Sequence, residues 1–485
     1  MSITRHLARH AAERPGAPAL TCGSDHFDYA RLYALVEDCA ARLAAAPPGG
    51  IALNLPNGAA LAVLFLAAAR AGREGQVLDP GWPPAQREQV LARIRPARLL
   101  SADAGSDFHL PAGDLGELPA ALGLAGPVPP QPDGEAPFYV GFTSGSTGLP
   151  KGYRRSHRSW TASFDADTQE FGIGAGDVIL APGALTHSLF LYALARGLDA
   201  GAHVVLSPSF RPRAVAELAR RHTASVLYGV PTQLGLLFDH LAAEGERLGG
   251  IRLVLCSGAK WPPGRRALLD LHLPGAAFAE FYGASELSFV TVAKDAEKVP
   301  EGSVGRAFAG VRITIRDRAG RRLPAGRTGL VFVESPFLFS GYATGDSPDL
   351  LAHDGALSVG DMGRLDRDGF LFLAGRARRM IVTSGKNLYP EEVERVLETH
   401  PAVAAAAVLG VPDGKRGERL VAFLALAGEK VPARAELTSF LRGRLSLFKV
   451  PRIYARLADW PLTGSGKTDF AAVARRWPLR CEVLA

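Results

Sequence analysis

Hydrophobic and polar positions repeat one pattern along most of residues 1–286: a short apolar run, then a longer segment with helical spacing. The runs at 202–206, 225–228 and 253–256 are short and apolar, as buried strands are. Each precedes an amphipathic segment, and these segments predict helices at 213–221, 232–243 and 263–271. Strands that alternate with helices favour layered α/β structure with parallel sheets.

The N-terminal region shows the same alternation. Residues 3–45 combine helical spacing with a short strand at 19–22, and residues 50–55 predict a strand that ends at a Pro-Asn-Gly turn. The longest apolar run, 59–69, is too short to span a bilayer and predicts a buried helix. We therefore expect no transmembrane segment.

Beyond residue 286, apolar and polar positions alternate between Gly and Pro turns. The segments 310–316 and 329–333 are examples, and they predict a small antiparallel barrel. Beyond residue 375 the pattern predicts a compact α/β unit of roughly a hundred residues, with a helix and two strands at 390–400, 403–409 and 419–426.

The length predicts more than one domain, because 485 residues exceed what a single hydrophobic core supports. We place the boundary at 376–379. The predicted fold class is α/β, with a large N-terminal domain at 1–376 that holds the layered parallel subdomains and the barrel. The small C-terminal α/β domain occupies 377–485.

Composition narrows the function only slightly. Hydrophobic residues make up 47% of the chain and charged residues 21%, which is ordinary for a globular protein. The net charge of +7 suits anionic ligands, but the arginines are scattered rather than clustered, which argues against nucleic-acid binding. Four cysteines without CxxC spacing predict neither a zinc site nor a disulfide framework. The N-terminus lacks the apolar segment of a signal peptide, so a cytoplasmic location is expected.

The strongest chemical signal is a loop of small residues after the apolar run 138–142. It reads Thr143-Ser144-Gly145-Ser146-Thr147-Gly148 and leads to Lys151. Backbone N–H groups and hydroxyls without bulky side chains, followed by one cation, are suited to binding a polyphosphate. A flexible Ser/Gly linker would belong to a longer low-complexity region, and this run is short.

This loop is not a Walker P-loop. The segment 464–468 reads GSGKT, but the required first glycine would fall on Pro461. Only a short tail follows it, which is too little for a βαβ nucleotide-binding unit.

Four further motifs follow the loop in order along the chain. They are Tyr-Gly-Ala-Ser-Glu at 282–286, Gly360-Asp361, a region from Gly375-Arg376 through Gly385-Lys386-Asn387 to Pro-Glu-Glu-Val-Glu at 390–394, and Pro-Leu-Thr-Gly-Ser-Gly-Lys at 461–467. With the loop, they resemble the adenylate-forming superfamily: acyl- and aryl-CoA synthetases, nonribosomal adenylation domains and luciferases. The chain is most similar to an acyl- or aryl-CoA ligase.

The resemblance implies a two-step reaction. ATP first converts a carboxylic acid into an acyl-adenylate, with release of pyrophosphate, and a thiol then displaces AMP. The implied cofactors are ATP, Mg²⁺ and CoA, or the phosphopantetheine of a carrier protein in place of CoA. The first step brings two anions together, so the protein's task is mainly electrostatic.

The resemblance also assigns roles to individual residues. Ser285, where most members have Thr, contacts the α-phosphate, and Glu286 holds Mg²⁺. Lys467 bridges the carboxylate and the α-phosphate during adenylation. The remaining nucleotide contacts are the phosphate loop with Lys151, Tyr282 with Gly283 on one face of the adenine, Gly258 and Ala259 on the other face, and Asp361 with Arg376 at the ribose. Each has a structural alternative, such as a turn at Tyr282 or a solvated lysine at 467, but the ordered set favours the catalytic interpretation.

Two conformations are implied for the small domain, which is mobile in the family. One presents Lys467 for adenylation, and the other presents the loop at Gly385 and Lys386 for attack by the thiol. The hinge position is Arg378, where the family commonly has Asp or Lys.

The acid and the acceptor are less constrained. His187 resembles a His or aromatic residue beside the pantetheine tunnel, although a core or surface histidine is the alternative. No Asp occurs at 178–198, which disfavours an α-amino acid. The expected pocket is mostly apolar and fits an aryl or medium-chain acid, with Leu189, Tyr228, Gly229, Val230 and Leu287 as its lining.

Three kinds of enzyme share these motifs: a CoA ligase, a stand-alone enzyme that loads a carrier protein, and a luciferase-like oxygenase. No phosphopantetheine site of the Gly/Asp-Ser-Leu type follows Lys467, so no carrier domain is expected. We favour CoA over a carrier protein. Assembly as a homodimer is left open.

Overall fold

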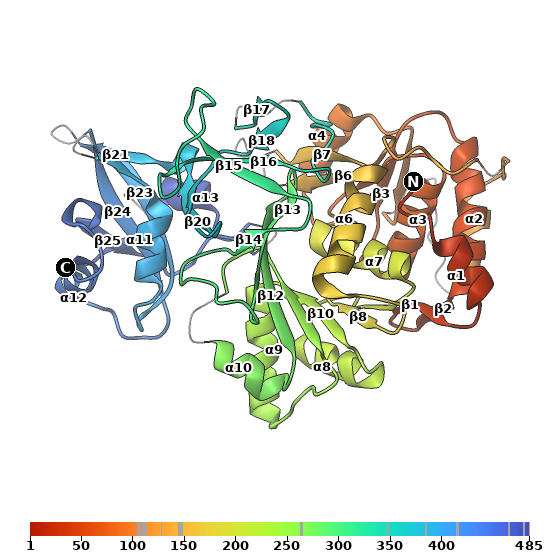
Figure 1. The fold of residues 1–485 in the computed structure, drawn as a ribbon, viewed down its shortest axis with the longest axis horizontal. Helices are drawn as coiled ribbons and strands as arrows, with labels where there is room; N and C mark the ends of the chain where they lie inside the picture. Colours follow the sequence, from red (N-terminus) through yellow and green to blue (C-terminus); the bar gives the residue numbers. More distant parts are fainter. Residues whose placement is uncertain are drawn as a thin grey trace.

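The computed structural model describes residues 1–485, apart from 104–107, 109–113, 128, 144–148, 262–264, 346, 348, 384–385, 414–416, 464–465, 479–480 and 485. For residues 382, 386, 387 and 417 it describes the backbone only. The chain forms four sheets with helices packed between and around them, and the C-terminal sheet lies at one end of the elongated molecule (Figure 1).

The first sheet has five strands and carries the predicted phosphate loop. In spatial order the strands are β5 (Arg98–Ser101), β3 (Ile51–Asn54), β4 (Gly75–Val77), β6 (Pro137–Thr143) and β7 (Lys151–Ser156). All pair in parallel except β6 and β7, which form an antiparallel hairpin. The phosphate loop is therefore the connection of that hairpin.

The second sheet has nine strands and is parallel through its centre. Its order is β14 (Arg306–Ala307), β13 (Ser288–Lys294), β12 (Ala277–Ala284), β11 (Leu253–Cys256), β10 (Val226–Gly229), β8 (Val178–Ala181), β9 (His203–Leu206), β1 (Pro18–Cys22) and β2 (Asp25–Asp28). Helices α8 (Pro212–Arg221), α9 (Pro231–Glu244) and α10 (Arg266–His272) gather beside its middle strands (Figure 1). The predicted alternation of strand and helix is thus confirmed.

The main hydrophobic core joins these two sheets. Helix α3 (Ala59–Arg70) is buried along its whole length, as expected for a helix that is apolar on every face. Helices α6 (His157–Phe171) and α7 (Ser188–Ala200) contribute to the same core. The other helices of this part are α1 (Leu7–Glu13), α2 (Tyr29–Ala45), α4 (Pro84–Ile94) and α5 (Leu118–Leu122).

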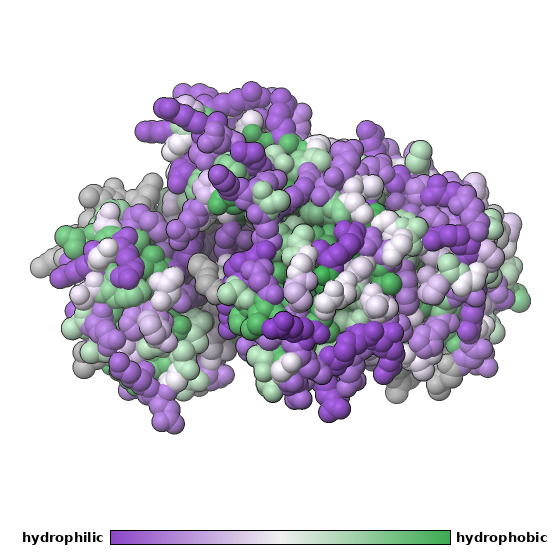
Figure 2. Space-filling model, turned by 60° about the horizontal axis from the view of Figure 1, so that its bottom comes forward, coloured by the Kyte–Doolittle hydropathy of each residue, from purple (hydrophilic) through white to green (hydrophobic). Residues whose placement is uncertain are grey.

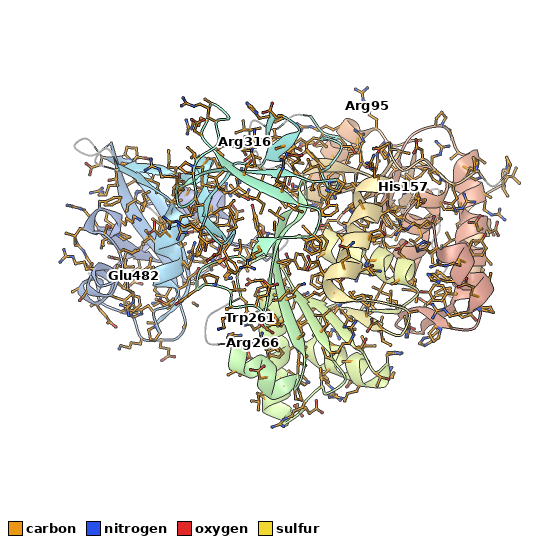
Figure 3. The ribbon with its side chains drawn as sticks, in the orientation of Figure 1. Arg95, His157, Trp261, Arg266, Arg316 and Glu482 are labelled. Carbon is orange, nitrogen blue, oxygen red and sulfur yellow. The ribbon has the colours of Figure 1, made fainter. Side chains whose placement is uncertain are left out.

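His157, at the start of α6, lies inside this core (Figure 3). Its ring stacks on Phe138 at 4.8 Å, and its Nδ1 accepts a hydrogen bond of 3.2 Å from the backbone N–H of Ile3. Burial lowers the pKa of His157 to about 3. The side chain is therefore neutral near pH 7 and packs as part of the hydrophobic core.

The third sheet is antiparallel and corresponds to the predicted barrel region. Its strands are β15 (Arg312–Arg316), β16 (Gly329–Glu334), β17 (Leu351–His353), β18 (Ala356–Ser358), β19 (Asp361–Leu365) and β20 (Leu371–Arg376). The C-terminal sheet holds β21 (Ile381–Thr383), β22 (Lys386–Leu388), β23 (Val403–Asp413), β24 (Gly417–Leu426), β25 (Ile453–Arg456) and β26 (Glu482–Val483). Helices α11 (Pro390–Leu397), α12 (Arg434–Arg442) and α13 (Phe470–Arg476) belong to this C-terminal part.

Three predicted boundaries differ from the structure by three residues or more. Helix α11 ends at Leu397 rather than at residue 400, because the last backbone bonds there tighten to i→i−3 turns. Strand β23 continues to Asp413 instead of 409, since it pairs with β24 over that whole length. Helix α10 begins at Arg266, and residues 262–264 of its predicted start lie outside the described part. In the described part of the chain, no helix has both the length and the apolar character needed to cross a membrane.

Candidate active site

The residues at the two ends of the phosphate loop are placed by the β6–β7 hairpin. Thr143 ends β6 opposite Lys151, which begins β7. The Lys151 Nζ donates to Ser347 Oγ at 2.8 Å, and the Gly152 N–H donates to Thr344 Oγ1 at 2.9 Å. Ser144, Gly145, Ser146, Thr147 and Gly148 lie outside the described residues.

Ser285 and Glu286 occupy the tight turn between β12 and β13. Gly283 is required in this hairpin, because a Cβ there would collide with the backbone of Ser288. The Glu286 Oε1 accepts a hydrogen bond of 2.8 Å from the hydroxyl of Tyr342. Tyr342 was not singled out from the sequence, since a lone tyrosine in a loop carries no recognisable signal.

Asp361 is held by two neighbours at the predicted ribose position. Its Oδ2 accepts a 2.5 Å hydrogen bond from the Tyr282 hydroxyl, and its Oδ1 lies 3.0 Å from the Nε of Arg376. Asp361 and Arg376 face one another across the β19–β20 pair. Asp361 is the first residue of β19, and the chain turns just before it at Gly360, which has a φ of +81°.

Tyr282 lies within β12, which contradicts the alternative of a turn at that position. Burial raises the pKa of Tyr282 far above its ordinary value, and the nearby Asp361 carboxylate raises it further. The hydroxyl therefore stays protonated and remains a donor to Asp361. We infer that Tyr282 orients the carboxylate in addition to its predicted place beside the adenine.

Lys467 faces this group of residues from the C-terminal part of the chain. Burial lowers the pKa of its ammonium group, the Arg376 guanidinium lowers it further, and Asp361 opposes both. Lys467 also acts on His187, whose pKa is lowered first by burial and then by Lys467, against the effect of Asp79. Lys467 is thus an electrostatic neighbour of Asp361, Arg376 and His187. A hydrophilic recess separates the C-terminal lobe from the rest of the molecule (Figure 2).

This lowered pKa predicts the pH dependence of the first half-reaction. Lys467 must be protonated to neutralise developing negative charge, so the adenylation rate should fall as pH rises. The fall should come at a lower pH than the ordinary lysine pKa of about 10.4. Pyrophosphate exchange measured against pH tests this. A Lys467→Arg variant should move the alkaline fall upward, and an unchanged midpoint would assign it to another group.

The predicted hinge lies in a single 3₁₀ turn, Ala377–Arg379. The Arg378 Nη1 lies 3.1 Å from Asp349 Oδ2, which links the turn to the large domain. Arg379 is tied to the small domain through Glu394 at 2.6 Å and through its position over the Phe470 ring at 3.6 Å. For the loop of the second half-reaction, Gly385 and the Lys386 side chain lie outside the described residues.

The structure brings together only part of the predicted acid pocket. Tyr228 and Gly229 end β10 and are buried, and Val230 follows them as the N-cap of α9. Gly258 has a φ of +95°, and a Cβ built on it would lie 3.3 Å from Val230, which places the Gly258-Ala259 segment beside the pocket. Leu189 packs against the main core, as Tyr228 does.

Leu287 belongs to a different cluster from the other predicted pocket residues. It is buried with Val290 and with Ile315 of the antiparallel sheet, whereas Tyr228 lies in the main core. Leu287 therefore supports the turn at Ser285 and Glu286 from the side of the antiparallel sheet.

The site residues fit Mg²⁺ as it occurs with nucleotides. Mg²⁺ keeps several waters and is commonly held by one or two carboxylates together with substrate phosphates. Glu286 supplies one such carboxylate, held by the Tyr342 hydroxyl. Among the residues that the structure describes, no three His, Cys, Asp or Glu side chains are arranged to hold a metal by themselves. The single carboxylate of Glu286 is therefore suited to a Mg²⁺ ion that binds together with ATP.

Comparison with known proteins identifies the family of the chain. The model of the AMP-binding enzyme family matches residues 7–343, and the model of the AMP-binding enzyme C-terminal domain matches 392–467. An uncharacterized acyl–CoA ligase from Bacillus subtilis is 38% identical over 98% of both chains. An L-proline–[L-prolyl-carrier protein] ligase from Streptomyces coelicolor is 30% identical over 99% of this chain and 97% of its own.

The solved structures give the same result. The O-succinylbenzoate coenzyme A synthetase of Bacillus subtilis in complex with AMP aligns with a TM-score of 0.85 and 26% identity, over 99% of this chain and 98% of its own. The fold, the order of the motifs and these matches agree along nearly the whole length. The chain belongs to the AMP-binding enzyme family, and within that family it is an acid–thiol ligase most similar to the acyl-CoA ligases.

Proposed function

We propose that this enzyme activates an aryl or medium-chain carboxylic acid with ATP and transfers the acyl group to CoA, releasing AMP and pyrophosphate. The observation that carries the proposal is that Lys467 is an electrostatic neighbour of Asp361 and Arg376, which are ion-paired with each other. A cation delivered to that point would lie where the substrate carboxylate and the α-phosphate must meet. The proposed thiol ester then forms in a second step, after the small domain has turned about Arg378.

We assign a different role in adenylation, the first step, to each of the site residues. Asp361, held by Tyr282 and Arg376, has lone pairs left to accept hydrogen bonds from the ribose hydroxyls. The Ser285 hydroxyl and the Lys151 ammonium group contact phosphate oxygens, and Lys467 neutralises charge on the entering carboxylate. Mg²⁺, held at Glu286, supplies further charge neutralisation at the phosphates when bound. Fixed charges in a partly buried site are effective because little reorganisation is needed as the reaction proceeds.

The proposed acid follows from the environment of the pocket. Tyr228, one of the expected lining residues, belongs to the main hydrophobic core, and Leu189, another, packs against that core. An ammonium group on the substrate would need a nearby carboxylate, and the segment 178–198 contains no Asp. These features favour an acid with an apolar body over an α-amino acid.

CoA is proposed as the acceptor, and a carrier protein is the second candidate. The relative with the higher identity is named a CoA ligase, and the carrier-protein ligase has the lower identity. Basic side chains on the small domain, such as Arg442 and Arg444, are compatible with either acceptor, because both offer negative charge.

A screen of pyrophosphate release tests the proposal. Release should require both a carboxylic acid and Mg²⁺, and CoA should accelerate turnover through thiol ester formation. The screen should cover aryl, fatty and amino acids, first with CoA and then with pantetheinylated carrier proteins. Formation of ADP and phosphate would refute the adenylation mechanism. Transfer to carrier protein with none to CoA would establish the second candidate.

A further inference from the structure

Arg155 is a buried cation without a carboxylate partner among the described residues. It lies on β7 with 2% of its surface exposed. Its Nη1 donates to the backbone carbonyl of Ser285 at 3.1 Å, while its Nε and Nη2 have no hydrogen-bond partner and no contact with solvent. Burial lowers the pKa of Arg155 to about 10, so the group remains charged near neutral pH. A buried charge left in this state is strongly destabilising, which points to a missing anion.

Arg196, the other fully buried arginine of the large domain, has hydrogen-bond partners for its guanidinium group. Arg196 is 1% exposed and lies 2.6 Å from Asp167 through its Nε. Its Nη2 donates to Thr168 at 2.8 Å and to the carbonyl of Ile173 at 3.0 Å. Burial alone therefore does not explain the free nitrogens of Arg155.

The free nitrogens of Arg155 form one edge of the guanidinium group. The N–H bonds of Nε and Nη2 run parallel on that edge and match the two oxygens of a carboxylate. This chain uses the same edge elsewhere. Arg252 binds Asp177 through Nε and Nη2, each at 2.8 Å, and Arg5 binds Asp199 through the same pair at 2.9 and 3.2 Å.

The free edge belongs to a side chain on the same face of β7 as Tyr153, next to the turn at Ser285. Along β7, Tyr153 comes first, and its hydroxyl interacts with Ser188 at the start of α7 and with Ser285. Arg155 follows on the same face of the strand, two residues further from the phosphate loop. Its electrostatic neighbours include Tyr192, one helical turn beyond Ser188.

Two buried tyrosines follow beyond this point. The Tyr228 hydroxyl has no hydrogen-bond partner within the described structure, and the Tyr192 hydroxyl interacts with Ser163. The two tyrosines influence each other electrostatically, and Asp167 and Arg196 are neighbours of both. Tyr228 is also a residue of the expected acid pocket. Glu286 is a neighbour of Arg155, but its Oε1 is already bound by Tyr342.

We propose that Arg155, with the Tyr192 and Tyr228 hydroxyls, binds a second anionic group of the substrate, so that the enzyme acts on an acid with an apolar body and a carboxylate at its far end. This inference rests on the proposed function, since it identifies the substrate class of that same site. Arg155 would select the substrate without taking part in adenylation. Its bond to the Ser285 carbonyl would couple the filled pocket to the turn that carries Ser285 and Glu286.

Matched pairs of acids test the proposal in the wild-type enzyme. Pyrophosphate release is compared for hexanoate against hexanedioate and for benzoate against benzene-1,4-dicarboxylate. We expect kcat/KM to be at least about 100-fold higher for the diacid of at least one pair, because a buried group built to bind an anion rejects an analogue that lacks it. A preference for the monoacid in both pairs overturns the inference while leaving the proposed function intact. No acid-dependent release with any of the acids overturns both.

Two variants test whether Arg155 causes the preference for the diacid. Arg155→Met keeps the length of the side chain and should remove the preference for the diacid, so that kcat/KM falls more for the diacid than for the monoacid. Arg155→Lys keeps the charge but not the parallel N–H pair and should give a smaller preference than the wild type. Equal loss of kcat/KM for both members of each pair, in a variant that melts at the wild-type temperature, would make Arg155 a support for the Ser285 turn only.

A binding measurement covers the case in which the variants fail to fold. In the wild-type protein with a non-hydrolysable ATP analogue, the diacid should raise the melting temperature more than its monoacid partner does at the same concentration. Equal shifts for the two acids would contradict the inference.

Discussion

Lys467→Ala is expected to slow acyl-adenylate formation by roughly two to three decades, a loss of about 3–4 kcal/mol of transition-state stabilisation. The structure supplies the physical reason. Lys467 lies close enough to Arg376 and Asp361 for each to shift its pKa, so the ammonium group is delivered to the nucleotide residues. Without this ammonium group, the substrate carboxylate and the α-phosphate approach one another with less of their negative charge neutralised. Acid-dependent pyrophosphate exchange measures this step directly.

The same variant should leave the second half-reaction largely intact. We expect thioester formation from supplied acyl-adenylate and CoA to use the second conformation proposed for the small domain, in which Lys467 is turned away. Lys430→Ala is a suitable control, because Lys430 is an exposed lysine of the same domain and lies in a loop before α12. Equal damage to both half-reactions would show that Lys467 has a different role.

Arg378→Pro is expected to preserve adenylation and to abolish thioester transfer. Proline fixes φ near −65°, which suits a 3₁₀ turn such as Ala377–Arg379 and prevents the rotation needed to leave it. In this structure Lys467 is an electrostatic neighbour of Asp361 and Arg376, so we expect the variant to hold the small domain in the arrangement proposed for adenylation. Pyrophosphate exchange and transfer from supplied acyl-adenylate separate the two steps.

Arg378→Ala is the matched control for this experiment. It removes the 3.1 Å ion pair with Asp349 but leaves the backbone free to rotate. Thioester transfer should therefore survive in the alanine variant and fail in the proline variant. Normal rates for both half-reactions in Arg378→Pro would move the pivot to another residue, with Arg379 the first to examine.

The predicted domain boundary at 376–379 stays a prediction, but its surroundings have a physical explanation. Two neighbouring arginines are tied to opposite sides of the turn. Arg378 binds Asp349 of the large domain, and Arg379 binds Glu391 and Glu394 of α11. A rotation about Arg378 would release the first contact while the second travels with the small domain.

The sequence alone determined the order and type of most elements. A period of two along a strand and of 3.6 along a helix comes from local geometry, so segments such as α9 and β16 could be predicted within a few residues. The motifs that carry the chemistry were recognisable for the same reason, because the phosphate loop and the turn at Ser285 each lie within one short segment.

Only the tertiary structure decided how these segments act on one another. Tyr282 donates to Asp361 across 79 positions of sequence, Tyr342 to Glu286 across 56, and Arg155 to Ser285 across 130. Such pairs depend on how the sheets meet and on the register of their strands, which no local pattern encodes. The same holds for Arg155, which looks like any other arginine in the sequence. The role proposed for Arg155 is inferred from its burial without an anionic partner, and burial is a property of the folded chain.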